Sequence, residues 1–153
     1  MNLKIRAEIL FWIITAVITF IVMHPIYNYY GMEYPFYWSN IPFIIIFLTY
    51  TRYIFLLKYT PFSQTHWVKI GLIFLSIPLL LVLVDGLYEF QRYLDVMGFV
   101  DISKDDANEA SSMAKYARYQ YLFFGTGAIM VLVFLPLRMI VSIWRVTNKK
   151  SKV

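Results

Sequence analysis

The sequence contains no cysteine and only two histidines among its 153 residues. The absence of cysteine excludes disulfides, thiol catalysis, and zinc or iron–sulfur sites that need cysteine ligands. Charged residues are also scarce: they make up 15% of the chain, where soluble domains average roughly 25%. The chain has no phosphate-binding loop, nucleophile elbow, zinc-protease helix or dinucleotide fingerprint. We therefore expect neither an enzyme activity nor a cofactor or metal site.

Apolar residues make up 60% of the chain and aromatic residues 20%. Four apolar stretches, at about residues 5–26, 41–57, 68–88 and 119–143, are long enough to cross a bilayer, which takes about 20 helical residues. The second begins at Ile41-Pro42, where proline is tolerated in a first helical turn. The sequence thus predicts an all-α membrane protein, a single domain over residues 1–153 with four transmembrane helices.

The distribution of Lys and Arg predicts the orientation of these spans. One side carries one acid, Glu8, and ten basic residues: Lys4, Arg6, Arg52, Lys58, Lys69, Arg138, Arg145, Lys149, Lys150 and Lys152. The other side carries eight acids but only four basic residues: Arg92, Lys104, Lys115 and Arg118. Because segments rich in Lys and Arg stay inside, we expect both termini in the cytoplasm, and a bacterial inner membrane fits this topology. Nucleic acid is not an expected partner, because the basic residues lie along one membrane face.

The third and fourth spans continue an apolar helical pattern beyond the membrane. One arm carries bulky residues spaced three and four apart: Leu80, Leu83, Leu87, Phe90, Leu94 and Met97. The returning arm carries smaller ones: Ala107, Ala110, Ala114, Ala117, Tyr121, Phe124, Ala128 and Val131. Ser103 and Asp106 resemble a capping box that starts this arm. We expect helices 3 and 4 to extend outward as an antiparallel helical hairpin over about residues 86–118, closed on itself or open to a partner protein.

The first outer loop, residues 24–40, holds seven aromatic residues. The simpler interpretation is an interfacial aromatic belt that packs under the hairpin. The alternative is a docking surface for a partner, because aromatic anchors dominate binding hot spots. The candidate docking residues are Tyr30, Tyr34, Tyr37 and Trp38.

Charged residues within or beside the spans form two groups. On the outer side, Asp85, Glu89, Arg92 and Arg118 are expected to form an ion-pair cluster, and the alternative is a carboxylate pair for a cation, proton or polar substrate. On the inner side, Arg52, Lys58, Lys69 and Arg138 are candidates for binding a lipid phosphate, with snorkelling to the headgroups as the alternative. The two histidines, His24 and His66, fall at opposite membrane boundaries, so one metal or haem cannot use both.

These observations favour an accessory or structural subunit of a larger membrane or envelope complex. The expected partners are the lipid bilayer and other membrane or envelope proteins, which would dock on the outer hairpin and the aromatic loop. The alternative is a small transporter or lipid-binding protein that uses Arg52 with the inner basic residues, or Asp85 with Glu89.

Overall fold

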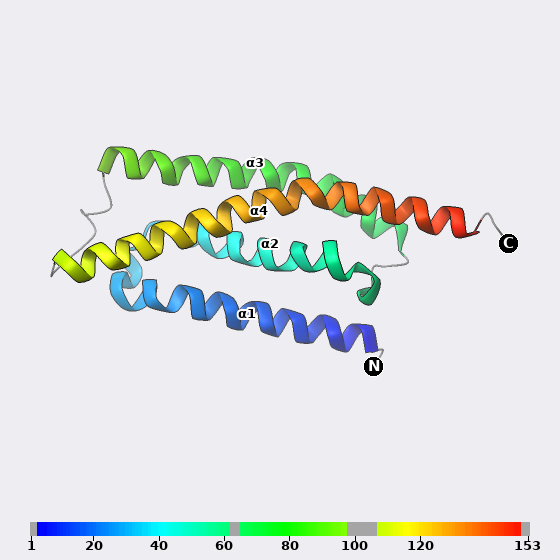
Figure 1. Ribbon diagram of the computed structural model, residues 1–153, viewed down its shortest axis with the longest axis horizontal. Helices are drawn as coiled ribbons and strands as arrows, with labels where there is room; N and C mark the ends of the chain where they lie inside the picture. Colours follow the sequence, from blue (N-terminus) through cyan, green and yellow to red (C-terminus); the bar gives the residue numbers. More distant parts are fainter. Residues whose placement is uncertain (1–2, 62–64, 98–106, 151–153) are drawn as a thin grey trace.

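The computed structural model describes residues 3–61, 65–97 and 107–150. Its four long helices are α1 (Leu3–Tyr30), α2 (Tyr37–Leu56), α3 (His66–Met97) and α4 (Ala107–Lys150), with short 3₁₀ turns at Gly31–Glu33 and Leu57–Tyr59 (Figure 1). Each long helix includes most or all of one predicted span, and each is apolar and long enough to cross a membrane. The start of α1 and the end of α4 lie at the same end of the bundle (Figure 1).

The predicted outer end of the bundle is the end opposite the two termini, and the predicted inner end is the end that holds them (Figure 1). At the outer end, α1 and α2 differ from their expected bounds. Pro25 does not end α1, which continues to Tyr30 and stops where Gly31 adopts a positive φ of 58°. The next helix begins at Tyr37, where the Asn40 N–H donates to the Phe36 carbonyl oxygen at 2.9 Å. The expectation that Pro42 lies in the first turn of its helix is therefore wrong: it lies in the second turn. Because Pro42 has no N–H, the backbone carbonyl group one turn before it accepts no hydrogen bond within the helix.

The four helices pack around two hydrophobic clusters. The larger one joins α2, α3 and α4, and its buried residues are Phe43, Tyr50, Tyr53, Leu57, Leu83, Phe90, Tyr121, Ala128, Leu132, Leu135 and Met139. The smaller one, the outer cluster, joins the end of α1 and the loop after it to α2 and α4, and its buried residues are Met23, Ile26, Tyr30, Tyr34, Ile44 and Ala117. Because α2 and α4 contribute to both clusters, these two helices form the centre of the bundle.

The predicted seam between helices 3 and 4 exists over part of its length. Leu80, Leu83, Leu87, Phe90 and Leu94 all pack in the larger cluster with Tyr121, Phe124, Ala128 and Val131 of α4. Phe90 and Tyr121 stack with ring centroids 3.8 Å apart. Ala117, one turn before Tyr121, is instead buried in the outer cluster with residues of α1. The Tyr116 hydroxyl also donates to the Val22 carbonyl oxygen of α1 at 2.9 Å.

Beyond the Phe90–Tyr121 stack, α3 and α4 separate. Figure 1 shows their outer ends diverging, with the start of α4 beside the end of α1. The side chains of Met97, Ala107 and Ala110 lie outside the described part of the chain, as do the Ser103 and Asp106 capping box and the turn. The closed antiparallel hairpin over residues 86–118 therefore stays a prediction.

Two sets of hydrogen bonds set the relative heights of the helices. At the outer end, the Tyr121 hydroxyl lies 2.7 Å from Ser39 Oγ and 3.0 Å from the Gly86 carbonyl oxygen. At the inner end, Arg138 Nε donates to the Ile54 carbonyl oxygen at 2.9 Å. Along α2, Ser39 and Ile54 are about 22 Å apart at 1.5 Å per residue. Both α3 and α4 continue past the outer level, over residues 87–97 and 107–120.

Candidate functional site

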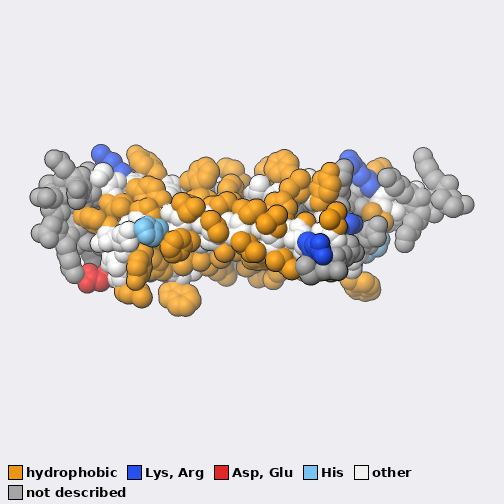
Figure 2. All heavy atoms as spheres, turned by 90° about the horizontal axis from the view of Figure 1, so that it is seen from below, with side chains coloured by type: hydrophobic (Ala, Val, Ile, Leu, Met, Phe, Trp, Pro, Cys, Tyr) orange, Lys and Arg blue, Asp and Glu red, His pale blue; other side chains and the backbone are white. Residues whose placement is uncertain are grey.

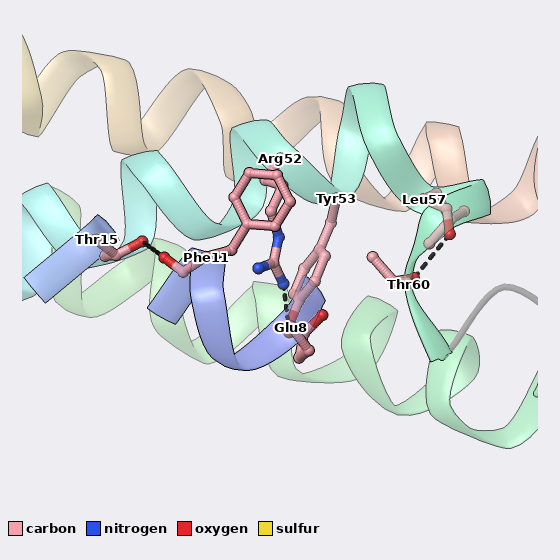
Figure 3. Close-up of polar contacts among 7 residues, drawn as sticks. All are labelled: Glu8, Phe11, Thr15, Arg52, Tyr53, Leu57 and Thr60. Atoms are coloured by element: carbon pink, nitrogen blue, oxygen red, sulfur yellow. Dashed lines mark hydrogen bonds and ion pairs between the residues drawn. The ribbon is translucent and has the colours of Figure 1, made fainter. Parts of the chain in front are cut away.

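An ion pair joins α1 to α2 near the inner end of the bundle. One face of α1 turns toward α2 and carries Glu8 and Phe11, three residues apart (Figure 3). Arg52 Nη2 of α2 donates to Glu8 Oε1, and the side chains are only 8% and 16% exposed. The Tyr53 hydroxyl donates to the same carboxylate oxygen at 3.0 Å (Figure 3). The carboxylate thus has two donors although it is largely buried.

Aromatic rings enclose the guanidinium of this pair. The Arg52 Cζ atom lies 4.9 Å from the centroid of the Phe11 ring and 4.7 Å from that of Tyr53. A cation over an aromatic face is attracted by the negative potential of the ring, and the attraction is stronger where water is excluded. The arrangement therefore holds the two helices together through charge. The Glu8 carboxylate and the Arg52 guanidinium are bonded to each other and largely buried. Neither is therefore placed to exchange a proton with a substrate.

Sequence reasoning named Arg52 but missed its partner. Arg52 was a candidate for lipid phosphate, yet its guanidinium is bound to a carboxylate of the same chain. A signal for this contact was present in the sequence, because Glu8 is the single acid among the residues predicted to face inward. A buried charge is seldom stable without an opposite charge. The only acid on that side was thus the natural partner of the deepest base.

The other inner basic residues do not assemble around Arg52. Arg138 is half-buried and donates to the Ile54 carbonyl oxygen. Lys69 is buried and close enough to Arg138 for the two positive charges to interact. The side chain of Lys58 lies outside the described part of the chain. Lipid-phosphate binding by this group stays a prediction.

The four outer charged residues are all exposed. Asp85, Glu89 and Arg92 lie on α3 and Arg118 lies on α4, beside the level of the Tyr121 hydroxyl. Within the described residues no ion pair joins any two of them. The outer ion-pair cluster therefore stays a prediction.

The aromatic residues of the first outer loop pack mainly on one another. The rings of Tyr30 and Tyr34 have centroids 5.8 Å apart, and those of Tyr34 and Tyr37 are 5.1 Å apart and nearly perpendicular. The Tyr37 hydroxyl donates to the Gly31 carbonyl oxygen at 2.6 Å, which ties the start of α2 to the turn after α1. Burial raises the pKa of the Tyr34 hydroxyl well above its ordinary value, and the neighbouring Tyr121 adds to the shift.

The structure separates the four candidate docking residues into two kinds. Tyr30 and Tyr34 are buried in the outer cluster and offer no surface to a partner. Tyr37 is partly buried, whereas Trp38 is 93% exposed. Trp38 therefore keeps the exposure that a docking residue needs, and the two buried tyrosines support the loop that presents it.

A pocket of about 320 Å³ opens at the same end of the bundle. It lies between the last turns of α1, the first 3₁₀ turn and the first turns of α2, and it is lined by Phe20, Met23, His24, Tyr27, Met32, Tyr37 and Ile41. His24 Nδ1 is 3.3 Å from the Asn28 amide nitrogen on the exposed side of α1. In the described part of the chain, no three His, Asp or Glu side chains are placed to hold a metal ion.

No protein-family model matches the chain, and no curated protein or solved structure shows significant similarity to it.

Proposed function

We propose that this protein is a four-span subunit of a bacterial inner membrane that binds other membrane or envelope proteins at its outer end. Four helices of sufficient length and apolar character support the membrane assignment. Figure 2 shows the α1 side of the bundle as a broad hydrophobic band, with charged side chains only toward its two ends. The excess of Lys and Arg at the end that holds both termini supports a cytoplasmic location for that end.

The observation that carries the docking proposal is the exposure of Trp38. This side chain is 93% exposed in the first turn of α2, next to the level where Ser39 meets Tyr121. Large aromatic side chains that stay exposed on a rigid support are typical anchors of protein interfaces, because they bury much area at little conformational cost. The loop around Tyr34 and Tyr37 supplies that rigid support through its edge-to-face ring contact and the hydrogen bond from the Tyr37 hydroxyl to the Gly31 carbonyl oxygen.

The neighbouring pocket strengthens the proposal. Tyr37 and Ile41, which flank Trp38 in the sequence, both line it. Interfaces commonly pair an anchor on one partner with a pocket for an anchor of the other. The outer end of this bundle offers both features side by side. The outer parts of α3 and α4 extend past the same level and add surface for a partner outside the lipid.

Site-specific photo-crosslinking in native membranes tests this function. A photoreactive amino acid at position 38 should give one discrete protein adduct. Trp67 is the matched control, because it is also highly exposed (83%) but lies at the opposite end of the bundle, in the first turn of α3. The same probe at position 67 should crosslink only to lipid. Adducts to lipid alone at both positions would show that Trp38 is an interfacial belt residue, and the docking function would be wrong.

A further inference from the structure

Four buried side chains in the outer half of the bundle carry polar atoms without a hydrogen-bond partner among the described residues. They are the hydroxyls of Tyr30 and Tyr34 and both polar atoms of the Asn40 and Gln120 amides. Asn40 has no exposed surface, and Tyr34, Tyr30 and Gln120 are 2%, 6% and 8% exposed. Each is thus more than nine-tenths buried. Together they present hydroxyls and amides that can both donate and accept.

These groups belong to one layer of the structure. The rings of Tyr30 and Tyr34 pack against each other within the outer cluster. The Asn40 amide is close enough to the Tyr34 hydroxyl to act on its pKa, although the two groups do not meet the geometry of a hydrogen bond. On α2, Asn40 is one helical turn from Ile44, which is buried in the same cluster. On α4, Gln120 lies between Ala117 and Phe124, which both pack in that cluster. These positions place the four side chains beside the outer cluster, and we infer from the helical spacing that their polar atoms face one layer there.

Leaving these groups unbonded would be costly. Moving one amide or hydroxyl from water into an apolar environment without a hydrogen bond costs its full free energy of desolvation. Several such groups in one layer would consume a large part of the small net stability of a folded domain. A small molecule bound within the layer would remove this cost by forming hydrogen bonds to these groups.

We propose that this layer, formed by Tyr30, Tyr34, Asn40 and Gln120, is a binding site for one or more structural water molecules. The site presents donors and acceptors in mixture, and water complements both with one molecule. No carboxylate or basic side chain belongs to it, so an ion would lack a counter-charge. The layer borders the large side chains of the outer cluster, and because protein interiors are closely packed we expect a ligand as small as water.

The pocket at the outer end provides a route of entry. Met23 and Tyr37 line this pocket, and both also pack in the outer cluster that borders the polar layer. We therefore expect water from the outer surface to reach the polar layer when the side chains of Met23 and Tyr37 move. Such exchange leaves the helix backbones unchanged.

Radiolytic footprinting in ¹⁸O-labelled water tests the proposal on the full chain in lipid nanodiscs. Hydroxyl radicals formed from a bound water oxidise the nearest side chain even where bulk solvent is excluded. We expect Tyr34 to be modified several-fold faster than Tyr121. Tyr121 is the matched control, because it is buried in the same region but its hydroxyl is bonded to Ser39 and Gly86. Equal, slow modification of both tyrosines would overturn the proposal.

Two variants assign the water to this layer. Asn40→Leu and Gln120→Met each remove amide groups, and each should reduce the modification of Tyr34 toward that of Tyr121. Thr126→Val is the control, because its exposed hydroxyl bonds only to its own helix, at the Leu122 and Phe123 carbonyl oxygens. Undiminished labelling of Tyr34 in both amide variants would refute the assignment. If Asn40→Leu fails to fold, Gln120→Met alone decides the question.

Discussion

The ring of Phe47 lies directly against the backbone of Gly127. A Cβ atom at Gly127 would be 2.8 Å from both Cδ2 and Cε2 of Phe47, closer than carbon atoms approach in folded proteins. The ring has little freedom to retreat, since it also packs edge-on against Phe123 and Phe124 with centroids 5.7 Å away. The missing side chain at this position is thus what lets α2 and α4 pack at this level.

Gly127→Ala is therefore expected to destabilise the protein by about 1–3 kcal/mol, the usual cost of overpacking. The matched control is Gly71→Ala on α3, where a Cβ would meet nothing within 4 Å. That change should be neutral or stabilise by up to about 1 kcal/mol, because alanine loses less backbone freedom in a helix. Denaturation in mixed micelles measures both free energies. Equal effects of the two variants would contradict the packing of Phe47 on Gly127.

The buried Glu8–Arg52 pair predicts a strongly non-additive double-mutant cycle. Glu8→Gln or Arg52→Met alone removes one charge and leaves its partner unpaired, which should cost about 3–5 kcal/mol. The combined variant should recover most of that loss, because it leaves no charge uncompensated. Tyr53→Phe removes one donor to the carboxylate and should cost about 0.5–1.5 kcal/mol. Additive free energies of unfolding in the cycle would show that the pair does not form.

The buried Tyr34 hydroxyl predicts a loss of stability at alkaline pH. Its pKa in the folded protein is raised by burial above the ordinary 10.0. Above pH 10.0 the unfolded chain releases this proton and the folded chain keeps it, so the free energy of unfolding falls as the pH rises. Tyr34→Phe should lose less stability than the parent between about pH 8 and about pH 11. Parallel losses in the two proteins would mean that Tyr34 ionises normally.

The proposed topology predicts the outcome of reporter fusions. Fusions at Val153 and in the link between α2 and α3, at residues 59–65, should give a cytoplasmic signal. Fusions at Met32 and Asp101 should give an external one. An external reading at Val153 with a cytoplasmic N-terminus would require an odd number of crossings and would exclude the four-span arrangement.

The sequence predicted the four helices and much of their packing, because these depend on apolar length and helical spacing. The seam from Leu80 to Leu94 and its counterpart from Tyr121 to Val131 are confirmed as residues of the larger cluster. Ala117 did not follow this pattern. Its small side chain suits a close approach to any helix, and only the three-dimensional crossing of α4 toward α1 decides which one.

Site residues were harder to predict, since exposure is a property of the assembled bundle. Tyr30, Tyr34 and Trp38 are alike in the sequence as aromatic loop residues. Two are buried and one is exposed only because the turn at Gly31 folds the loop back onto α4. Glu8 and Arg52 are 44 positions apart, and no local periodicity relates residues on different helices. The sequence signal for this pair was that Glu8 is the single acid among the basic residues on the predicted inner side.

The Glu8–Arg52 contact also bears on how the chain is made. The carboxylate is near the start of α1 and the guanidinium near the end of α2, so the ribosome completes α1 long before the counter-charge exists. A lone carboxylate enters hydrocarbon at high cost and stays at the wet inner surface until it is neutralised. We therefore expect α1 to wait at the translocon for its neighbour. The first two helices would then pass into lipid as one unit.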